Sequence, residues 1–208
     1  MKYLNILLFL FLSTIVTQSY AAVIADISVE NNDGVIIYYN YINDGMELEV
    51  TCCSISGWYG SSDYSGNVNI PEEVTYMNRT RKVTAIGHYA FQNCGKLTSV
   101  TIPSSVTSID YGAFHNCGFS NIIIPQSVTF IGNDAFSGCA LNSVTIPNNV
   151  TSISDNSFSD CRNLSSVTIG SSVTSIGNES FRGCSSLTSI TIPSSVTFIG
   201  EDAFRSCI

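Results

Sequence analysis

Eight cysteines are the most reactive side chains of this 208-residue chain, and six of them recur at nearly equal spacing. The six are Cys94, Cys117, Cys139, Cys161, Cys184 and Cys207. Cysteines in a secreted chain are typical of a disulfide framework, and clustered cysteines are typical of a zinc site. Equal spacing instead indicates a straight row, with one cysteine on each of several stacked coils whose parallel strands lie about 4.8 Å apart.

A straight row of cysteines is poorly suited to either kind of bond. Equivalent residues on stacked coils point the same way, whereas a disulfide requires the two Cβ atoms to converge. Zinc requires four ligands placed tetrahedrally around it, which a row does not provide. We therefore predict six buried thiols that fill space as small apolar groups. Cys52 and Cys53 lie outside the row, and the sequence leaves open whether they are cross-linked or free.

The other residue types that perform catalysis are few or scattered. The chain has two histidines, His88 and His115, and neither has a serine or cysteine at a spacing that suggests a nucleophile. Acids occur at variable turn positions, whereas glycoside hydrolysis needs two carboxylates that face each other across a cleft. There is no P-loop, calcium-loop or glycine-rich dinucleotide motif. We therefore predict that the protein is not an enzyme and binds no metal or cofactor.

The charge balance limits the partners of the chain. It carries 16 acidic and 8 basic side chains, and its net charge is −8. The acidic balance leaves no basic patch to neutralise phosphates, so we expect no nucleic acid partner. Anionic membrane surfaces are poor partners for the same reason.

The first 21 residues have the pattern of a secretory signal peptide. Lys2 supplies a positive charge, residues 6–16 are apolar, and Ser19 and Ala21 give a small-x-small cleavage signal. The apolar run is too short to span a bilayer, and no later segment is longer. We expect cleavage after Ala21 and a mature chain that is secreted or at the cell surface, without membrane insertion. An uncleaved anchor is the alternative.

The rest of the chain is dominated by a repeat. Val-Thr steps at Val83, Val106, Val128, Val150, Val173 and Val196 are separated by 23, 22, 22, 23 and 23 residues. A fixed period of this size indicates a solenoid, since one coil is too small to bury its own apolar face and must stack on its neighbours.

Each repeat carries two apolar sets. Leu97, Val100 and Ile102 follow the pattern L-x-x-L-x-L, and the proline or glycine that comes next ends the predicted short parallel strand. The second set is a valine and an isoleucine three residues apart, followed by a phenylalanine. These phenylalanines are Phe91, Phe114, Phe136, Phe158, Phe181 and Phe204. We predict a short irregular or 3₁₀-like turn for this second part, on the convex side of the solenoid.

The sequence "CGKLTSVTIPSSVTSIDYGAFHNC", from Cys94 to Cys117, resembles the BspA-like (Treponema pallidum-type) leucine-rich repeat family. The resemblance covers residues 83–208 and implies a β-rich solenoid of five full coils and a partial sixth. It further implies a secreted or surface protein, since members of that family include adhesins that bind host extracellular-matrix proteins or other bacteria. The motif itself carries no site residues.

Residues 22–82 differ in composition and are predicted to form a small β cap on the array. One hairpin is expected from residues 35–41 and 46–51, joined through Asn43, Asp44 and Gly45. A second is expected from residues 74–76 and 82–84, turning at Asn78 and Arg79. Residues 64–76 look like a degenerate half-repeat. A binding role is the alternative, because Trp58, Tyr59 and Tyr64 are aromatic residues of the kind that stack on sugars or proteins.

Residues that alternate with the apolar positions of each predicted strand should face outward as a ribbon of small polar groups. Candidate contact residues on this ribbon are Ser99, Thr101, Asn121, Ile123, Ser143, Thr145, Ser166, Thr168, Ser189 and Thr191. Ile123 is the one apolar interruption. Solenoids commonly bind through such extended faces, although serine and threonine are equally typical of an ordinary soluble β surface.

The resemblance therefore implies a solenoid that binds a protein ligand, such as host extracellular matrix or another cell surface. Two alternatives stay open: a glycan-binding protein that acts through Trp58 and Tyr59, and a non-functional fragment of a larger adhesin. Because the sequence stops at Ile208, partway through a repeat, end-to-end self-association at that coil is a further expectation.

Overall fold

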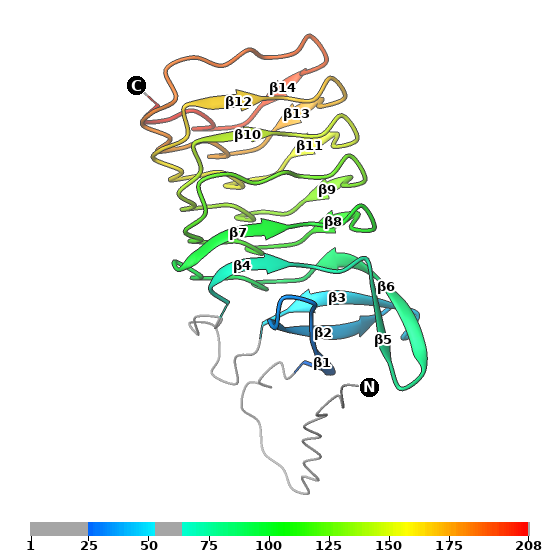
Figure 1. The fold of residues 1–208 in the computed structure, drawn as a ribbon. Helices are drawn as coiled ribbons and strands as arrows, with labels where there is room; N and C mark the ends of the chain where they lie inside the picture. Colours follow the sequence, from blue (N-terminus) through cyan, green and yellow to red (C-terminus); the bar gives the residue numbers. More distant parts are fainter. Residues whose placement is uncertain (1–24, 53–63, 208) are drawn as a thin grey trace, which may run out of the picture.

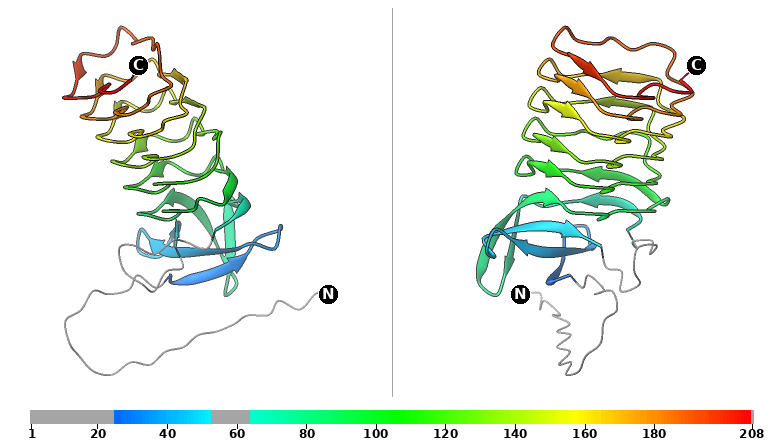
Figure 2. Two further views of the ribbon diagram at one scale, coloured as in Figure 1. Left: turned by 90° about the vertical axis from the view of Figure 1, so that its left-hand side faces the viewer. Right: turned by 180° about the vertical axis from the view of Figure 1, so that it is seen from behind.

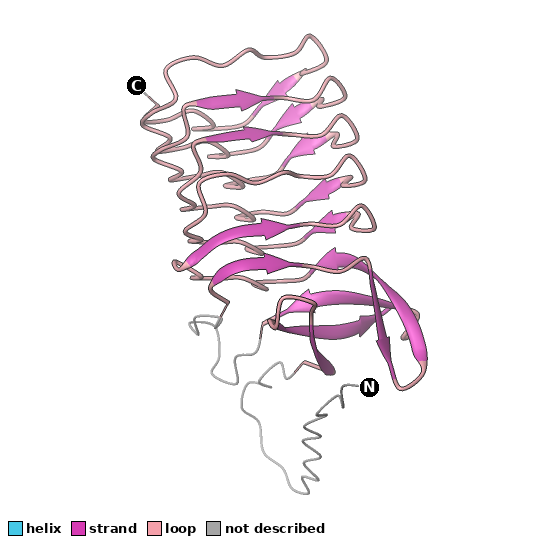
Figure 3. Cartoon of the chain, viewed as in Figure 1, coloured by secondary structure: helices cyan, strands magenta, loops and turns pink. Residues whose placement is uncertain are grey.

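The computed structural model describes residues 25–52 and 64–207. Over these residues the chain forms 14 strands joined by turns, and no helix (Figure 3). A small β domain lies at the N-terminal end, and coils stack on it one above another toward the C-terminus (Figure 1). The predicted signal peptide, Cys53, Trp58 and Tyr59 lie outside the described residues.

The N-terminal hairpin has the turn that the sequence predicted. Strands β1 (Ile27–Glu30), β2 (Ile36–Ile42) and β3 (Glu47–Thr51) form an antiparallel meander. Asn43, Asp44 and Gly45 connect β2 to β3 with φ values of 49°, 55° and 77°. Asparagine, aspartate and glycine are the residue types that adopt this left-handed conformation most easily, which explains the turn.

The second hairpin turns one residue earlier than expected. In the pair β5 (Glu73–Tyr76) and β6 (Arg79–Ile86), Tyr76 lies opposite Arg79, so the connecting residues are Met77 and Asn78. Both have positive φ, as a two-residue hairpin loop of this kind requires. Strand β6 also pairs in parallel with β3 on one side and with the coils on the other, so it joins the cap to the stack.

The coils form two rows of parallel strands on different sides of the stack (Figures 1 and 2). The first row contains β4 (Gly66–Asn69), β7 (Leu97–Thr101), β10 (Ser143–Thr145) and β12 (Ser166–Thr168). The pairs are β4 with β7 and β10 with β12; residues 119–124 and 187–192 hold the equivalent places without a strand. The segment expected to be a half-repeat thus supplies β4.

The second row was not predicted from the sequence. It contains β6, β8 (Ser108–Ile109), β9 (Phe130–Ile131), β11 (Ser152–Ile153), β13 (Ser175–Ile176) and β14 (Phe198–Ile199). These segments bond to the preceding coil, for example through the Thr107 N–H to the Thr84 carbonyl at 2.8 Å. Irregular structure was expected here. It begins only after these strands, because a two-residue strand is too short to show alternation in the sequence.

The phenylalanines stack into one continuous column through the core. Neighbouring ring centroids lie 5.0 to 5.5 Å apart, and their planes differ by 1° to 11°. Tyr64 extends the column at its N-terminal end, with its ring centroid 4.6 Å from that of Phe91. Its hydroxyl accepts the Tyr38 N–H and donates to the Thr51 carbonyl, each at 3.0 Å. Tyr64 therefore ties the cap to the core.

The cysteine row runs alongside the phenylalanines. Its first five members are buried and Cys207 is half-buried, and all six are free thiols. From Cys117 onward, each thiol donates to the phenylalanine carbonyl of the preceding coil at 2.9 to 3.2 Å. For the first five, this position agrees with the predicted role as small buried groups.

Each coil also reverses direction at two left-handed residues on either side of its phenylalanine. The first column, which we call the first turn column, is Tyr89, Gly112, Asp134, Asn156, Glu179 and Asp202. The second column is Asn93, Asn116, Gly138, Asp160, Gly183 and Ser206. Positive φ is unfavourable for residues with a Cβ and least so for asparagine and aspartate. Most members of both columns are glycine, asparagine or aspartate.

Candidate functional site

The outward side chains of the first strand row form one ribbon across the coils. All ten candidate residues of this ribbon are exposed. Their register is regular, since Ser143 pairs with Ser166 and Thr145 with Thr168. Between them Val144 points into the core and is 3% exposed. The alternation that follows from strand geometry thus places a row of hydroxyl groups outside and aliphatic groups inside.

Two asparagines of β4 complete the ribbon at its N-terminal end. The Asn67 side-chain oxygen accepts hydrogen bonds from Thr98 at 2.7 Å and Ser99 at 2.9 Å. The Asn69 oxygen accepts one from Thr101 at 2.6 Å. Sequence analysis did not select these asparagines. The sequence did contain a signal for them. Asn67 and Asn69 have the same spacing as the outward residues Ser99 and Thr101 of the neighbouring strand, although the sequence around them differs from that of the repeats.

Ile123 breaks the polar character of the ribbon. Its side chain is 85% exposed, the largest fraction among the exposed large apolar residues in the described part of the chain. The equivalent outward positions of the other coils hold Thr101, Thr145, Thr168 and Thr191. The next residue, Ile124, is only 6% exposed, so the chain keeps its normal register here. An aliphatic group is thus presented to solvent on a hydroxyl-rich surface.

The second strand row carries two exposed aromatic residues that the sequence analysis missed. Phe130 and Phe198 are 51% and 58% exposed. The register places Phe130 beside Ser108 and Phe198 beside Ser175. A phenylalanine in a column of serines was the signal that could have identified them. These residues face a different side of the stack from Ile123.

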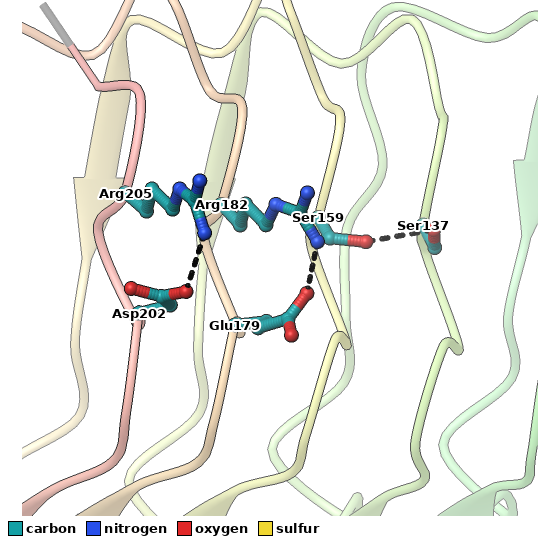
Figure 4. A network of polar contacts seen from close by, with 6 residues as sticks. All are labelled: Ser137, Ser159, Glu179, Arg182, Asp202 and Arg205. Atoms are coloured by element: carbon teal, nitrogen blue, oxygen red, sulfur yellow. Dashed lines mark hydrogen bonds and ion pairs between the residues drawn. The ribbon is translucent and has the colours of Figure 1, made fainter.

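The turns of the last coils carry charged residues that neutralise one another locally. Arg182 Nη1 lies 2.5 Å from Glu179 Oε2, and Arg205 Nη1 lies 2.9 Å from Asp202 Oδ2. Figure 4 shows these two pairs with the buried Ser137–Ser159 hydrogen bond of the preceding coils, which is 2.9 Å long. The Glu179 carboxylate raises the pKa of Arg182 through its hydrogen bond and charge. Because each arginine has its own carboxylate, this edge presents no unpaired basic patch to a phosphate.

The described residues hold no obvious centre for bond-making chemistry. Burial raises the pKa of the Cys184 thiol to about 12, and also raises the pKa of Cys117 and Cys161. Neutral buried thiols are poor nucleophiles. His88 Nδ1 lies 3.7 Å from Asp110 Oδ2, without a serine or cysteine joined to the pair in the described structure. No group of three potential metal ligands occurs among these residues.

The comparison with protein families identifies a repeat family. The model described as the BspA type leucine rich repeat region matches six copies over residues 84–208. A search of curated proteins gave no match. In the part of the chain that the structure describes, no helix is long and apolar enough to cross a membrane.

Several solved structures share the fold. A leucine-rich cell surface protein from Faecalibacterium prausnitzii is 30% identical, with a TM-score of 0.60 over 88% of this chain and 53% of that one. The pneumococcal vaccine antigen PcpA is 22% identical, with a TM-score of 0.66 over 88% and 48%. A leucine-rich repeat protein from Eubacterium ventriosum is 25% identical, with a TM-score of 0.50 over 81% and 50%. The chain thus spans about half the length of each of these proteins.

Proposed function

Because the chain belongs to the family of BspA-type leucine-rich repeat proteins, we propose that it is a secreted or cell-surface protein that binds a protein ligand. The ligand contacts the outward ribbon of the first strand row, with Ile123 as its apolar centre. Two similar structures support an exposed location, since one is described as a cell surface protein and the other as a vaccine antigen. The ligand class is a protein of the extracellular matrix or of another cell surface.

The observation that carries this proposal is the exposure of Ile123 within a regular polar surface. Interfaces derive most of their affinity from a few apolar or aromatic anchors surrounded by groups that exclude water. The hydroxyl groups on neighbouring strands provide such surroundings, because they offer donors and acceptors without long flexible side chains. The ladder between β10 and β12 fixes the spacing of the hydroxyl groups on the C-terminal side of Ile123, so little conformational entropy is lost there when a ligand binds.

The proposal includes no catalytic activity. We limit the proposal to binding because the thiols described above are buried, the charges are paired and the acids are scattered. Self-association through the last coil stays a prediction, and so does the use of Trp58 and Tyr59 by a glycan.

The test compares two substitutions that convert one coil to the residue used by its neighbours. In Ile123→Thr the ribbon acquires the threonine found in the other coils; in Phe130→Ser the second row acquires the serine of its neighbours. Binding of the mature chain to immobilised fibronectin, laminin, fibrinogen and type IV collagen is measured by biolayer interferometry. We expect saturable binding to at least one protein, about tenfold weaker for Ile123→Thr and unchanged for Phe130→Ser.

The opposite results would contradict the proposal. Loss of binding in Phe130→Ser alone would move the site to the second row. Absence of saturable binding to every protein of the panel, by a chain shown to be folded by circular dichroism, would argue against an adhesive role.

A further inference from the structure

The turns of the first two coils carry an aromatic cluster that has no counterpart in the later coils. Tyr89 and Tyr111 meet edge to face, with ring centroids 5.1 Å apart and planes at 89°. The ring of His88 lies 6.3 Å from that of Tyr111. Tyr111 is 37% exposed, His88 is exposed, and Tyr89 is half-buried. At the position of Tyr111 the later coils have Asn133, Asp155, Asn178 and Glu201.

The ring of Tyr89 lies directly over the turn of the next coil. Tyr89 has φ of 53° and is the only aromatic member of the first turn column. A Cβ at Gly112, the next member of that column, would lie 2.4 Å from Tyr89 Cε1. The ring therefore covers the backbone of Gly112, and glycine is required there to admit it. The positive φ belongs to the turn that every coil makes here, but a bulky residue with a glycine under its ring occurs only at this member of the first turn column.

Carboxylates surround the aromatic cluster. Asp110 lies beside His88, with Oδ2 and Nδ1 3.7 Å apart, and Asp134 lies beside the hydroxyl of Tyr111. The pKa of Asp134 is raised, chiefly because the carboxyl group is partly buried. The hydrogen bond from Tyr111 and the charge of His115 lower this pKa, and the charge of Asp155 raises it slightly. The rim thus supplies hydrogen-bond acceptors together with imidazole and phenol groups that donate or accept.

We propose that His88, Tyr89, Tyr111, Asp110 and Asp134 form a binding site for uncharged saccharides. A pyranose ring presents apolar C–H groups on its face and hydroxyl groups at its edge. An exposed tyrosine ring packs against the C–H face, and neighbouring carboxylates accept hydrogen bonds from the hydroxyls. The same carboxylates repel phosphates, sulfates and uronic acids, and the basic groove that nucleic acids require is absent from these turns. The site lies on a different surface from Ile123 and is independent of the protein-binding proposal.

The test uses substitutions that copy the later coils. Tyr89→Gly introduces the residue found at Gly112, where positive φ is accepted, so the chain should fold. Tyr111→Asn introduces the residue found at position 133. Asn156→Gly, in the same column but away from the tyrosines, is the matched control. Binding is measured by affinity gel electrophoresis in soluble starch, yeast mannan, galactomannan and glycol chitin, with heparin as the anionic comparison.

Retardation of the native chain by at least one neutral polysaccharide supports the site if Tyr89→Gly and Tyr111→Asn each weaken binding at least tenfold. Asn156→Gly should bind like the native chain, and heparin should not retard it. Three outcomes would overturn the site: no retardation by any of the four polymers, retardation by heparin alone, or binding that survives Tyr89→Gly and is lost in Trp58→Ala. Thermal unfolding followed by circular dichroism confirms that each variant is folded.

Discussion

The rings of Phe136 and Phe158 lie almost parallel in successive coils, with centroids 5.3 Å apart and planes 6° apart. Both side chains are fully buried. Phe136 has the same spacing to Phe114 on its other side. Each ring therefore contributes to the core of its own coil and to the interface with two neighbours, and this interface stabilises coils that are too small to fold alone.

Phe136→Ala should lower the free energy of unfolding by about 3–5 kcal/mol, because the substitution removes buried surface and leaves a cavity between two rings. Urea denaturation followed by far-ultraviolet circular dichroism measures the loss. The matched control is Phe130→Ala, since Phe130 is half exposed and its removal should change stability by about 0.5 kcal/mol or less. A loss below about 1 kcal/mol for Phe136→Ala would show that the column contributes little.

A second prediction concerns two glycines at equivalent positions of the first two coils. A Cβ at Gly118 would lie 2.1 Å from the carbonyl oxygen of Gly95, whereas a Cβ at Gly95 would meet nothing within 4 Å. Gly118→Ala should therefore destabilise the protein by about 1–3 kcal/mol or more, as backbones move apart. Gly95→Ala should be neutral or stabilising by roughly 0.4–1 kcal/mol, because it restricts the unfolded chain. Equal effects in thermal unfolding would contradict the close approach of these coils.

The period and the core were predictable from the sequence because one residue type recurs at each buried position. The phenylalanine column, the cysteine row and the outward place of Ile123 all follow from a fixed spacing combined with strand alternation. The hairpin at Asn43, Asp44 and Gly45 was predictable because these residues favour a left-handed turn.

The second strand row and the two left-handed columns were not predictable in the same way. Strands such as Ser108–Ile109 are too short to show a pattern of their own. The first turn column contains Tyr89, Gly112 and Glu179, which share a backbone conformation and not a side-chain type. The contact of Tyr89 with Gly112 joins residues 23 positions apart through the stacking of coils. It becomes visible only when the register of those coils is known.

A third prediction concerns the connection between the cap and the coils. Tyr64→Phe keeps the ring stacked on Phe91 but removes the hydroxyl that bonds to Tyr38 and Thr51. We expect the free energy of unfolding to fall by about 1–3 kcal/mol, because two backbone groups lose the hydroxyl that both of them bond to. Hydrogen exchange should accelerate most in β2 and β3. Tyr111→Phe, at an exposed position on the turns, is the control and should leave exchange in these strands unchanged. Uniform acceleration along the whole stack would contradict a local role for Tyr64.

The final prediction is a loss of stability at alkaline pH. Burial raises the pKa of Cys184 from 9.0 to about 12, and raises the pKa of Cys117, Cys161 and Cys207 in the same direction. Below pH 9 the thiols carry a proton in both the folded and the unfolded chain, so this stabilising contribution is fully present. Above pH 9 the unfolded chain releases protons that the folded chain retains, and the free energy of unfolding falls as the pH rises.

Between pH 7 and pH 10, Cys184 alone should account for a decrease of about 1.4 kcal/mol, since each pKa unit corresponds to about 1.4 kcal/mol. Urea denaturation at half-unit steps of pH, in the presence of a reductant, measures the slope of the free energy of unfolding against pH. In Cys184→Ala the protein should be less stable at pH 7, because of the cavity, but its slope above pH 9 should be smaller. Cys52→Ala, which alters a half-buried thiol outside the row, is the control for the loss of any one cysteine. A slope unchanged by Cys184→Ala would mean that the thiol row lies in contact with water.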